Sequence, residues 1–239
     1  MNFIKKVLLK IKYQYKATSE SYYKYLKGKG ITLGKNVKFY SPWTINIDIQ
    51  RPWMIEIGND VHITRGVSIL QHGYDWCVLQ KKYGTVLGSC GKVKIGNNVF
   101  IGVNTTILKG TEIGDNVIIG ANSLVSKKLE SNAVYAGNPV RYICSIEDYY
   151  KKRTNHQKEE AVDLVKQYKK TNGKYPPKEA LREFFWLFQN RNEELPEIYK
   201  NVLELENNYE NSYKLFMSTK PMFNGYNEFI KYIEEKEND

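Results

Sequence analysis

The 239-residue sequence contains no apolar run near the roughly 18 residues that a membrane-spanning helix requires. Its first residues show no signal-peptide cleavage pattern, so we expect a cytoplasmic protein. Cysteine is scarce, and Cys77, Cys90 and Cys144 stand at irregular spacing. That spacing matches neither a disulfide framework nor a zinc-binding motif, so the sequence predicts reduced cysteines and no metal.

The charge is strongly of one sign, with 36 Lys and Arg against 26 Asp and Glu and a formal net charge of +10. Such an excess favours an anionic partner, for which nucleic acid, a phosphorylated cofactor and a membrane surface are the candidates. The sequence contains no RNA- or DNA-binding motif, so we expect no nucleic-acid partner. The other two candidates stay open.

What the sequence has in abundance is a six-residue repeat. An apolar residue recurs without a slip at Ile95, Ile101, Ile107, Ile113, Ile119 and Val125. The same phase runs earlier, with a break at Arg51, through Leu33, Phe39, Ile45, Ile57, Ile63 and Ile69. A period of six fits neither an α-helix nor a simple strand, and it is typical of a parallel β-helix with about 18 residues per coil. The repeat therefore predicts a β fold over residues 31–143.

The repeat slips between Ile69 and Ile95, whose separation is not a multiple of six. We therefore expect a loop at about residues 72–92 to leave the β-helix. A regular solenoid extrudes such a loop mainly to build or cover a site. His72 stands at the base of this loop, where a neutral imidazole could act as a general base.

Residues 1–30 predict a helical segment before the repeat. Within it, residues 1–16 combine apolar residues at helical spacing with lysines, as in a basic amphipathic helix. Two interpretations stay open. The helix either lies on an anionic membrane surface or packs on the main domain with its lysines in solvent.

Residues 144–239 predict an α-helical region of three or four helices after the repeat. Long amphipathic helices are expected at about 145–170 and 194–216. An apolar helical stretch is expected after Pro177, and a short helix is expected at the end of the chain.

The residues from IGNNVF to AGNPVRYI resemble the hexapeptide-repeat acyltransferases, and in particular their sugar O-acetyltransferase branch, which includes the maltose and galactoside acetyltransferases. The string AGNPVR is similar to the family's terminal coil. The resemblance implies a left-handed parallel β-helix, a homotrimer, and acetyl-coenzyme A (acetyl-CoA) bound between neighbouring β-helices. The helical segments on either side lie outside it, although they resemble appendages of capsular and O-antigen polysaccharide acetyltransferases.

The resemblance also implies site residues by position. His72 matches the catalytic histidine, which takes the proton of a sugar hydroxyl as the oxygen attacks the thioester directly. The backbone N–H of Val103 matches the group that binds the acetyl oxygen and its oxyanion. The positions that match coenzyme A contacts are Val103, Ala121, Ser126, Lys127 and Arg141. Cys144 stands where related enzymes often carry a second basic residue, so other lysines are expected to assist.

The acceptor-binding region departs from the maltose and galactoside enzymes, so the resemblance does not name the sugar. The candidates for binding the acceptor or orienting the histidine are Asn46, Asp48, Tyr74, Asp75 and Trp76. The two aromatic rings could stack on a sugar or simply cover the coil.

The leading hypothesis is acetyl transfer to a hydroxyl of a capsular or O-antigen-type surface polysaccharide or its precursor. N-acetylation of a nucleotide-linked amino sugar stays open, as does a non-catalytic β-helix scaffold. A zinc carbonic anhydrase of the β-helix type would need three converging histidines. We exclude it, because His156 lies outside the repeat and only His62 and His72 remain.

Overall fold

The computed structural model describes Leu8 and residues 11–238, so the predicted helix over residues 1–16 lies largely outside the described residues. The chain divides into two compact units, Met1–Tyr149 and Tyr150–Asp239, called unit 1 and unit 2 below. Each unit has its own hydrophobic core. Within the described residues, no helix combines the length and the apolar character needed to cross a membrane.

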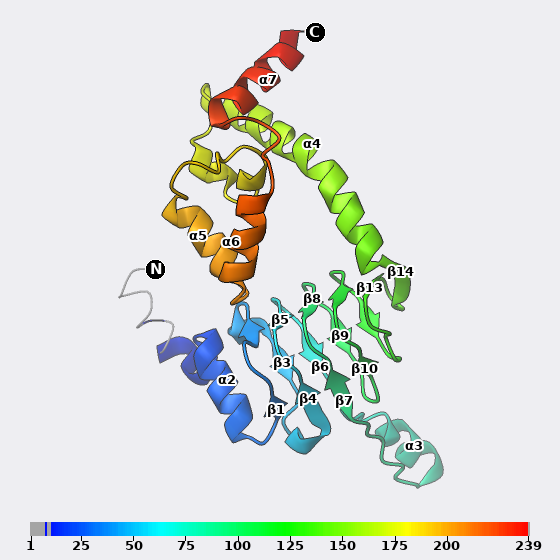
Figure 1. Ribbon diagram of the computed structural model, residues 1–239. Coiled ribbons are helices and arrows are strands. Elements are labelled where there is room, and N and C mark those ends of the chain that lie inside the picture. The colour runs from blue at the N-terminus through cyan, green and yellow to red at the C-terminus, as the bar shows by residue number, and fades with distance from the viewer. Residues whose placement is uncertain (1–7, 9–10, 239) are drawn as a thin grey trace. The chain divides into compact units, whose positions relative to one another are not determined.

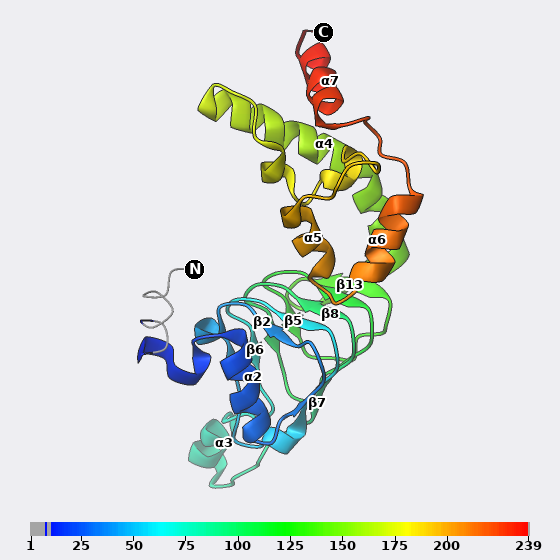
Figure 2. The same cartoon turned by 60° about the vertical axis from the view of Figure 1, so that its left-hand side comes forward.

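Unit 1 is built from short strands in three sheets (Figures 1 and 2). Sheet A contains β1 (Thr32–Leu33), β4 (Ile55–Ile57), β7 (Val93–Ile95) and β10 (Glu112–Ile113). Sheet B contains β2 (Lys38–Phe39), β5 (Val61–Ile63), β8 (Val99–Ile101), β11 (Val117–Ile119), β13 (Ala133–Ala136) and β14 (Arg141–Ser145). Sheet C contains β3 (Asn46–Ile47), β6 (Ser68–Ile69), β9 (Thr106–Ile107) and β12 (Leu124–Val125). As far as β12, the chain visits A, B and C in turn, which confirms the predicted parallel β-helix.

Equivalent residues of successive coils lie side by side. In sheet B, Val99 pairs with Val61 on one side and Val117 on the other, and the strands are parallel. The apolar residues of the repeat face the interior and are buried. Sheet B alone ends differently, because β14 runs antiparallel to β13.

Asparagines form the tight corners between the sheets. Asn98, Asn116 and Asn132 adopt left-handed φ angles of 53°, 55° and 59°, which asparagine tolerates better than most residues. Their side chains also form a ladder, since Asn98 donates to Asn116 and Asn116 donates to Asn132, each at 2.8 Å. The repeat therefore encodes both the core and its turns.

The first coil is covered by α2 (Ser19–Gly28), which follows the 3₁₀ helix η1 (Gln14–Lys16) and packs against β1 and β2. The side chains of Thr18 and Ser21 cap its start reciprocally. Its Tyr22 and Leu26 are buried in the core of unit 1. Two further 3₁₀ helices interrupt this coil, η2 (Pro42–Thr44) and η3 (Pro52–Met54).

The segment between β6 and β7 leaves the β-helix as a loop. Its base is closed by antiparallel pairing of His72 with Cys90, and the N–H of Gly73 donates to the carbonyl of Ser89 (3.1 Å). Beyond the base lies α3 (Trp76–Tyr83), a helix that the repeat did not predict. In both views α3 projects away from the stacked strands (Figures 1 and 2).

Unit 2 is helical. It contains most of α4 (Ile146–Asn172), the 3₁₀ helices η4 (Lys178–Leu181) and η5 (Phe185–Leu187), and α5 (Glu197–Glu204), α6 (Tyr209–Ser218) and α7 (Tyr226–Asn238). The helical character of the C-terminal region, predicted from its amphipathic pattern, is confirmed.

Two details of that prediction are wrong. The single helix expected at 194–216 is divided into α5 and α6, because Asn207 adopts a left-handed φ of 53°. The apolar stretch after Pro177 forms 3₁₀ turns instead of an α-helix. Phe185, Leu187 and Phe188 are all buried there, which one face of an α-helix could not achieve.

Candidate functional site

His72 lies where the chain leaves sheet C for the loop, and its imidazole Nδ1 contacts the carboxylate Oδ2 of Asp48. Asp48 directly follows β3, the strand that pairs with β6. Both side chains are largely buried, with 11% and 8% of their surface exposed. The other carboxylate oxygen of Asp48 accepts the N–H of Gln50 (3.0 Å). The carboxylate of Asp48 is thus held through both of its oxygens. Within the described residues, Nε2 of His72 has no hydrogen-bond partner.

Aromatic residues of the loop border this pair. The ring of Tyr74 meets the imidazole of His72 edge-on, with centroids 5.0 Å apart, and its hydroxyl accepts a hydrogen bond from the Gln50 side chain (2.8 Å). Trp76 is tilted against Tyr74 with a centroid distance of 6.1 Å. Tyr74 is exposed and Trp76 is half-buried, so both rings remain accessible beside the histidine.

The other acceptor candidates lie near the pair without joining it. The carboxylate of Asp75 lies over Gly73, where the missing side chain leaves room for it and for the ammonium of Lys109. Lys109 in turn contacts the hydroxyl of Ser89 at the loop base. Asn46 is exposed on β3. Of the two candidate aspartates, the structure places Asp48 against the histidine.

The strand order of sheet C gathers several candidates at one corner of the β-helix. The order is β12, β9, β6, β3, and the chain passes from these strands toward sheet A at what we call the C–A corner. Ser126 and Lys127 follow β12, Lys109 follows β9, His72 follows β6 and Asp48 follows β3. Since neighbouring strands are about 4.8 Å apart, Lys127 stands roughly 10 Å from the coil of His72, on the side opposite Asp48.

Val103 and Ala121 lie at a different corner, where the chain passes from sheet B to sheet C (the B–C corner). They occupy successive coils, and the carbonyl of Val103 accepts the N–H of Asn122 (2.7 Å). Within the described residues, the N–H groups of Val103 and Ala121 donate no hydrogen bond. This corner therefore presents free N–H donors, at the opposite edge of sheet C from His72.

Arg141 lies near the B–C corner as well. It pairs with Ala136, the last residue of β13, which approaches Gly120 of that corner. Its side chain is exposed, and Cys144 lies farther along β14. The structure thus separates the two predicted phosphate-binding cations, with Arg141 at one corner and Lys127 at the other.

A group of buried polar atoms near His72 lacks hydrogen-bond partners within the described residues. Apart from the contact inside the Asp48–His72 pair, these atoms are Asp48 Oδ2, Arg51 Nη1, Gln71 Nε2 and Oε1, and His72 Nδ1. All belong to the C–A corner of the first two coils. Proteins keep few such atoms, because each costs about 1–3 kcal/mol, so their concentration here marks the corner as a site.

Arg51 and Gln71 were not among the residues predicted from sequence. Arg51 gave a signal, since it places a charge where the repeat has an apolar residue. Gln71 gave none beyond its position next to His72.

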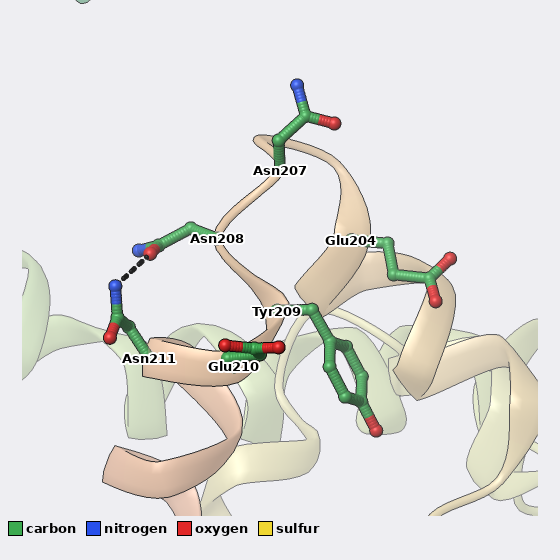
Figure 3. A pocket seen from close by; sticks show the side chains of 6 residues that line it. All are labelled: Glu204, Asn207, Asn208, Tyr209, Glu210 and Asn211. Carbon is green, nitrogen blue, oxygen red and sulfur yellow. Dashed lines mark hydrogen bonds between the residues drawn. The ribbon is translucent and has the colours of Figure 1, made fainter.

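Unit 2 contains hollows but none of the predicted site residues. One, of about 470 Å³, lies at the turn between α5 and α6 (Figure 3) and is lined by Glu204, Asn207, Asn208, Tyr209, Glu210 and Asn211. Figure 3 shows Asn211 hydrogen-bonded to Asn208 (2.8 Å), while the ring of Tyr209 points away from the turn of Asn207. No histidine, lysine or cysteine is among the residues that line this hollow. The residues that the structure describes include no cluster of three or more His, Cys, Asp or Glu able to hold a metal ion.

Comparison with known proteins identifies the family. The family model for the bacterial transferase hexapeptide (six repeats) matches residues 92–127. Protein CapG of Staphylococcus aureus is 40% identical over 149 residues, which span 59% of this chain and 85% of that protein. This chain belongs to the hexapeptide-repeat acyltransferase family. The acyltransferase is also 36% identical to the galactoside O-acetyltransferase of Escherichia coli K12 over 121 residues, 51% of this chain and 57% of that enzyme.

Solved structures are also similar to part of this chain. A hexapeptide-repeat-containing acetyltransferase from Vibrio cholerae is 18% identical, with coverage of 60% of this chain and 89% of that chain and a TM-score of 0.45. A galactoside acetyltransferase in complex with coenzyme A is 27% identical, with coverage of 62% and 82% and a TM-score of 0.42. The fold of the acyltransferase rests on its own strand order and its family, in which the parallel β-helix is left-handed.

Proposed function

We propose that this acyltransferase moves an acetyl group from acetyl-CoA to a sugar hydroxyl, with His72 as the general base. The observation that carries the proposal is the contact of His72 with Asp48 at the base of the loop. A histidine whose Nδ1 faces a carboxylate keeps Nε2 as its basic nitrogen and holds its ring in one orientation. That is the arrangement required to accept a proton from a bound hydroxyl.

The reaction moves one proton twice. Nε2 of His72 takes the proton of the acceptor hydroxyl while the hydroxyl oxygen bonds to the thioester carbonyl carbon. The carbonyl electron pair moves to its oxygen, and the N–H of Val103 binds the resulting anion. When the anion collapses, the carbon–sulfur bond breaks and His72 returns the proton to the departing sulfur. General-base assistance of this kind contributes about 10²–10⁴-fold, and Asp48 stabilises the imidazolium between the two transfers.

We also propose that neighbouring copies complete the site in a homotrimer. His72 and Val103 lie at opposite edges of sheet C, so one copy would supply the base and its neighbour the oxyanion donor. Acetyl-CoA would lie between the two copies. The candidate coenzyme A contacts divide between the two copies, with Ser126 and Lys127 on one copy and Ala121 and Arg141 on the other. Each copy then offers one cation to the phosphates.

The proposed acceptor is a sugar unit of a capsular or O-antigen-type surface polysaccharide, or its lipid-linked precursor, met at the cytoplasmic face of the membrane. The galactoside O-acetyltransferase relative acts on a sugar by its name, and Tyr74 and Trp76 offer rings suited to stacking on one. Leu8 and Ile11 are 60% and 72% exposed, and together with the lysines of residues 1–16 they suit contact with an anionic membrane surface.

Incubation of the purified protein with acetyl-CoA and sugars tests the proposal. We expect acceptor-dependent thiol release and a product that loses its acetyl group in mild alkali, as an ester does. An alkali-stable amide would identify an N-acetyltransferase instead. The variant His72→Ala should lose transfer and still be stabilised against heat by acetyl-CoA. No thermal shift of the native protein at saturating acetyl-CoA would favour a non-catalytic scaffold.

A further inference from the structure

Arg51 carries a positive charge for which the described residues offer no partner. Its side chain is half-buried, its Nη1 is fully buried, and within the described residues the guanidinium forms no ion pair or hydrogen bond. The nearest carboxylate in the sequence, that of Asp48, contacts His72 instead. Because a partly buried charge without a counter-ion is costly, Arg51 is a candidate for binding an anion from outside the chain.

The packing of the β-helix does not explain an arginine at this position. In sheet A, Ile55 of the first coil pairs with Val93 of the second, and Arg51 lies four residues before Ile55. The third coil passes from Ile107 to Thr111, the residue in line with Val93, in four residues, whereas the first coil takes eight residues from Ile47 to Ile55. Arg51 therefore lies in an inserted segment and fills no position of the repeated core, so its cation has another role.

Arg51 lies on the opposite side of His72 from the predicted cofactor residues. It follows β3, whereas His72 follows β6 and Lys127 follows β12 in the order β12, β9, β6, β3. With strands about 4.8 Å apart, β3, which leads to Arg51, is one strand beyond β6, and β12, which leads to Lys127, is two strands before β6. The two cations therefore follow strands on opposite sides of β6, with Lys127 on the side of the predicted coenzyme A contacts.

The structure assigns Arg51 as the residue that binds an anionic group of the acceptor, a carboxylate or a phosphate close to the hydroxyl that His72 deprotonates. This inference rests on the proposed function and adds the charge of the acceptor to it. The planar guanidinium fork takes either oxyanion through two parallel N–H···O bonds, which would fix the acceptor relative to His72. A neutral acceptor leaves the charge of Arg51 unpaired and is discriminated against.

Pairs of sugars that differ only in the anionic group test the inference. In both the gluco and the galacto series, the methyl glycoside is compared with the methyl glycoside of the uronic acid and with the sugar 1-phosphate. We expect kcat/KM to be at least about 10-fold higher for one acidic form, the uronate identifying a carboxylate site and the phosphate ester a phosphate site.

Variants then assign the preference to the residue. Arg51→Gln should remove the preference by lowering kcat/KM for the acidic sugar much more than for the neutral glycoside, while the KM for acetyl-CoA stays unchanged. Arg51→Lys should keep part of it, because charge remains without the fork. The control Arg182→Gln removes the same charge from an exposed position of unit 2 and should leave the preference intact.

Three results would overturn the inference while acetyl transfer stands. These are equal rates with acidic and neutral sugars, an equal loss with both in Arg51→Gln, and a raised KM for acetyl-CoA in that variant. An altered oligomeric state of Arg51→Gln would assign the anion to a neighbouring copy and would also overturn it. No transfer to any sugar together with no thermal shift by acetyl-CoA would instead overturn the proposed function.

Discussion

The two units of the chain build their cores from different side chains. Unit 1 buries aliphatic residues that repeat from coil to coil, so strands such as β8 and β11 present the same contacts in register. Unit 2 buries aromatic rings at varied angles, since Phe185 lies parallel to Tyr199 at 12° whereas Trp186 meets Phe216 at 82°. A repeated coil fixes its contacts in advance, whereas ring packing depends on each local geometry.

The treatment of buried polar groups differs as well, and two half-buried arginines show it. In unit 2, Arg191 Nε donates to the carbonyls of Phe216 (2.9 Å) and Thr219 (3.1 Å), and its guanidinium lies 3.8 Å from the Phe216 ring centroid. In unit 1, Arg51 has no such partners within the described residues. Unit 2 thus satisfies its buried cation internally, whereas in the described part of unit 1 the cation of Arg51, three residues after the Asp48 that contacts His72, is left without a partner. In unit 2 the buried polar groups belong to the packed structure, whereas in unit 1 the unpaired ones mark the candidate site.

The largest effect that separates the units is expected from their histidines. His72→Ala removes the proposed base and should lower kcat for acetyl transfer by about 10²–10⁴-fold. His156→Ala should leave kcat unchanged, because His156 is exposed on α4 and bonds only the carbonyl of Lys152 (2.8 Å) within the described residues. Steady-state rates, with the acetyl-CoA thermal shift as a check on folding, give the comparison. Similar losses in both variants would contradict a special role for His72.

Truncating one buried side chain in each core tests whether the units are independent. Ile101→Ala in unit 1 should cost about 2–5 kcal/mol and Phe216→Ala in unit 2 about 3–5 kcal/mol, since both residues are almost wholly buried. With independent cores, calorimetry should show two transitions, and each variant should lower one of them. A single transition that both variants lower would show that the units unfold together.

The sequence predicted unit 1 better than unit 2 for a physical reason. A six-residue period repeats the same demand for an inward apolar residue, so residues from Leu33 to Val125 could be assigned to the core before their contacts were known. The break between α5 and α6 depends on the backbone of Asn207, and the 3₁₀ turn η5 depends on simultaneous burial of neighbouring rings. Neither has a periodic signal in the sequence.

The candidate site was predictable only in part. The phase slip singles out His72, but Asp48 was one of several possible partners. The register that pairs Asn46 with Ser68 is longer than a regular coil, because the segment around Arg51 is inserted between them. A strict repeat therefore does not align Asp48 with His72, and the strand pairing was needed to bring them together.

Two buried glutamines provide a smaller test of the contrast between buried polar groups with and without hydrogen-bond partners. Gln71 is 0% exposed and neither amide atom is paired within the described residues, whereas Gln189 is 3% exposed and donates weakly to Asn190 (3.4 Å) and Glu193 (3.5 Å). Methionine has a similar shape without the polar amide. Gln71→Met should leave the free energy of unfolding unchanged or raise it, by as much as about 1–3 kcal/mol, and Gln189→Met should lower it by about 1 kcal/mol.

Urea denaturation of the two variants measures the difference. If Gln71→Met lowered stability as Gln189→Met does, then water or a neighbouring copy would already pair Gln71. The C–A corner would in that case be satisfied without a substrate.

The smallest effect is expected from an exposed lysine in each unit. Lys127 forms no ion pair within the described residues, whereas its neighbour Lys128 pairs with Glu130 (3.1 Å). Lys127→Ala should raise the KM for acetyl-CoA by about 3–10-fold, a loss near 1 kcal/mol, with kcat unchanged, because a phosphate contact binds ground state and transition state alike. Lys174→Ala in unit 2 should change neither constant.

The effect of Lys127→Ala on the KM for acetyl-CoA should also shrink at high salt, since the charges are exposed. An equal rise in KM for Lys128→Ala would mean that general positive charge attracts the cofactor, and that the proposed contact of Lys127 with coenzyme A is wrong.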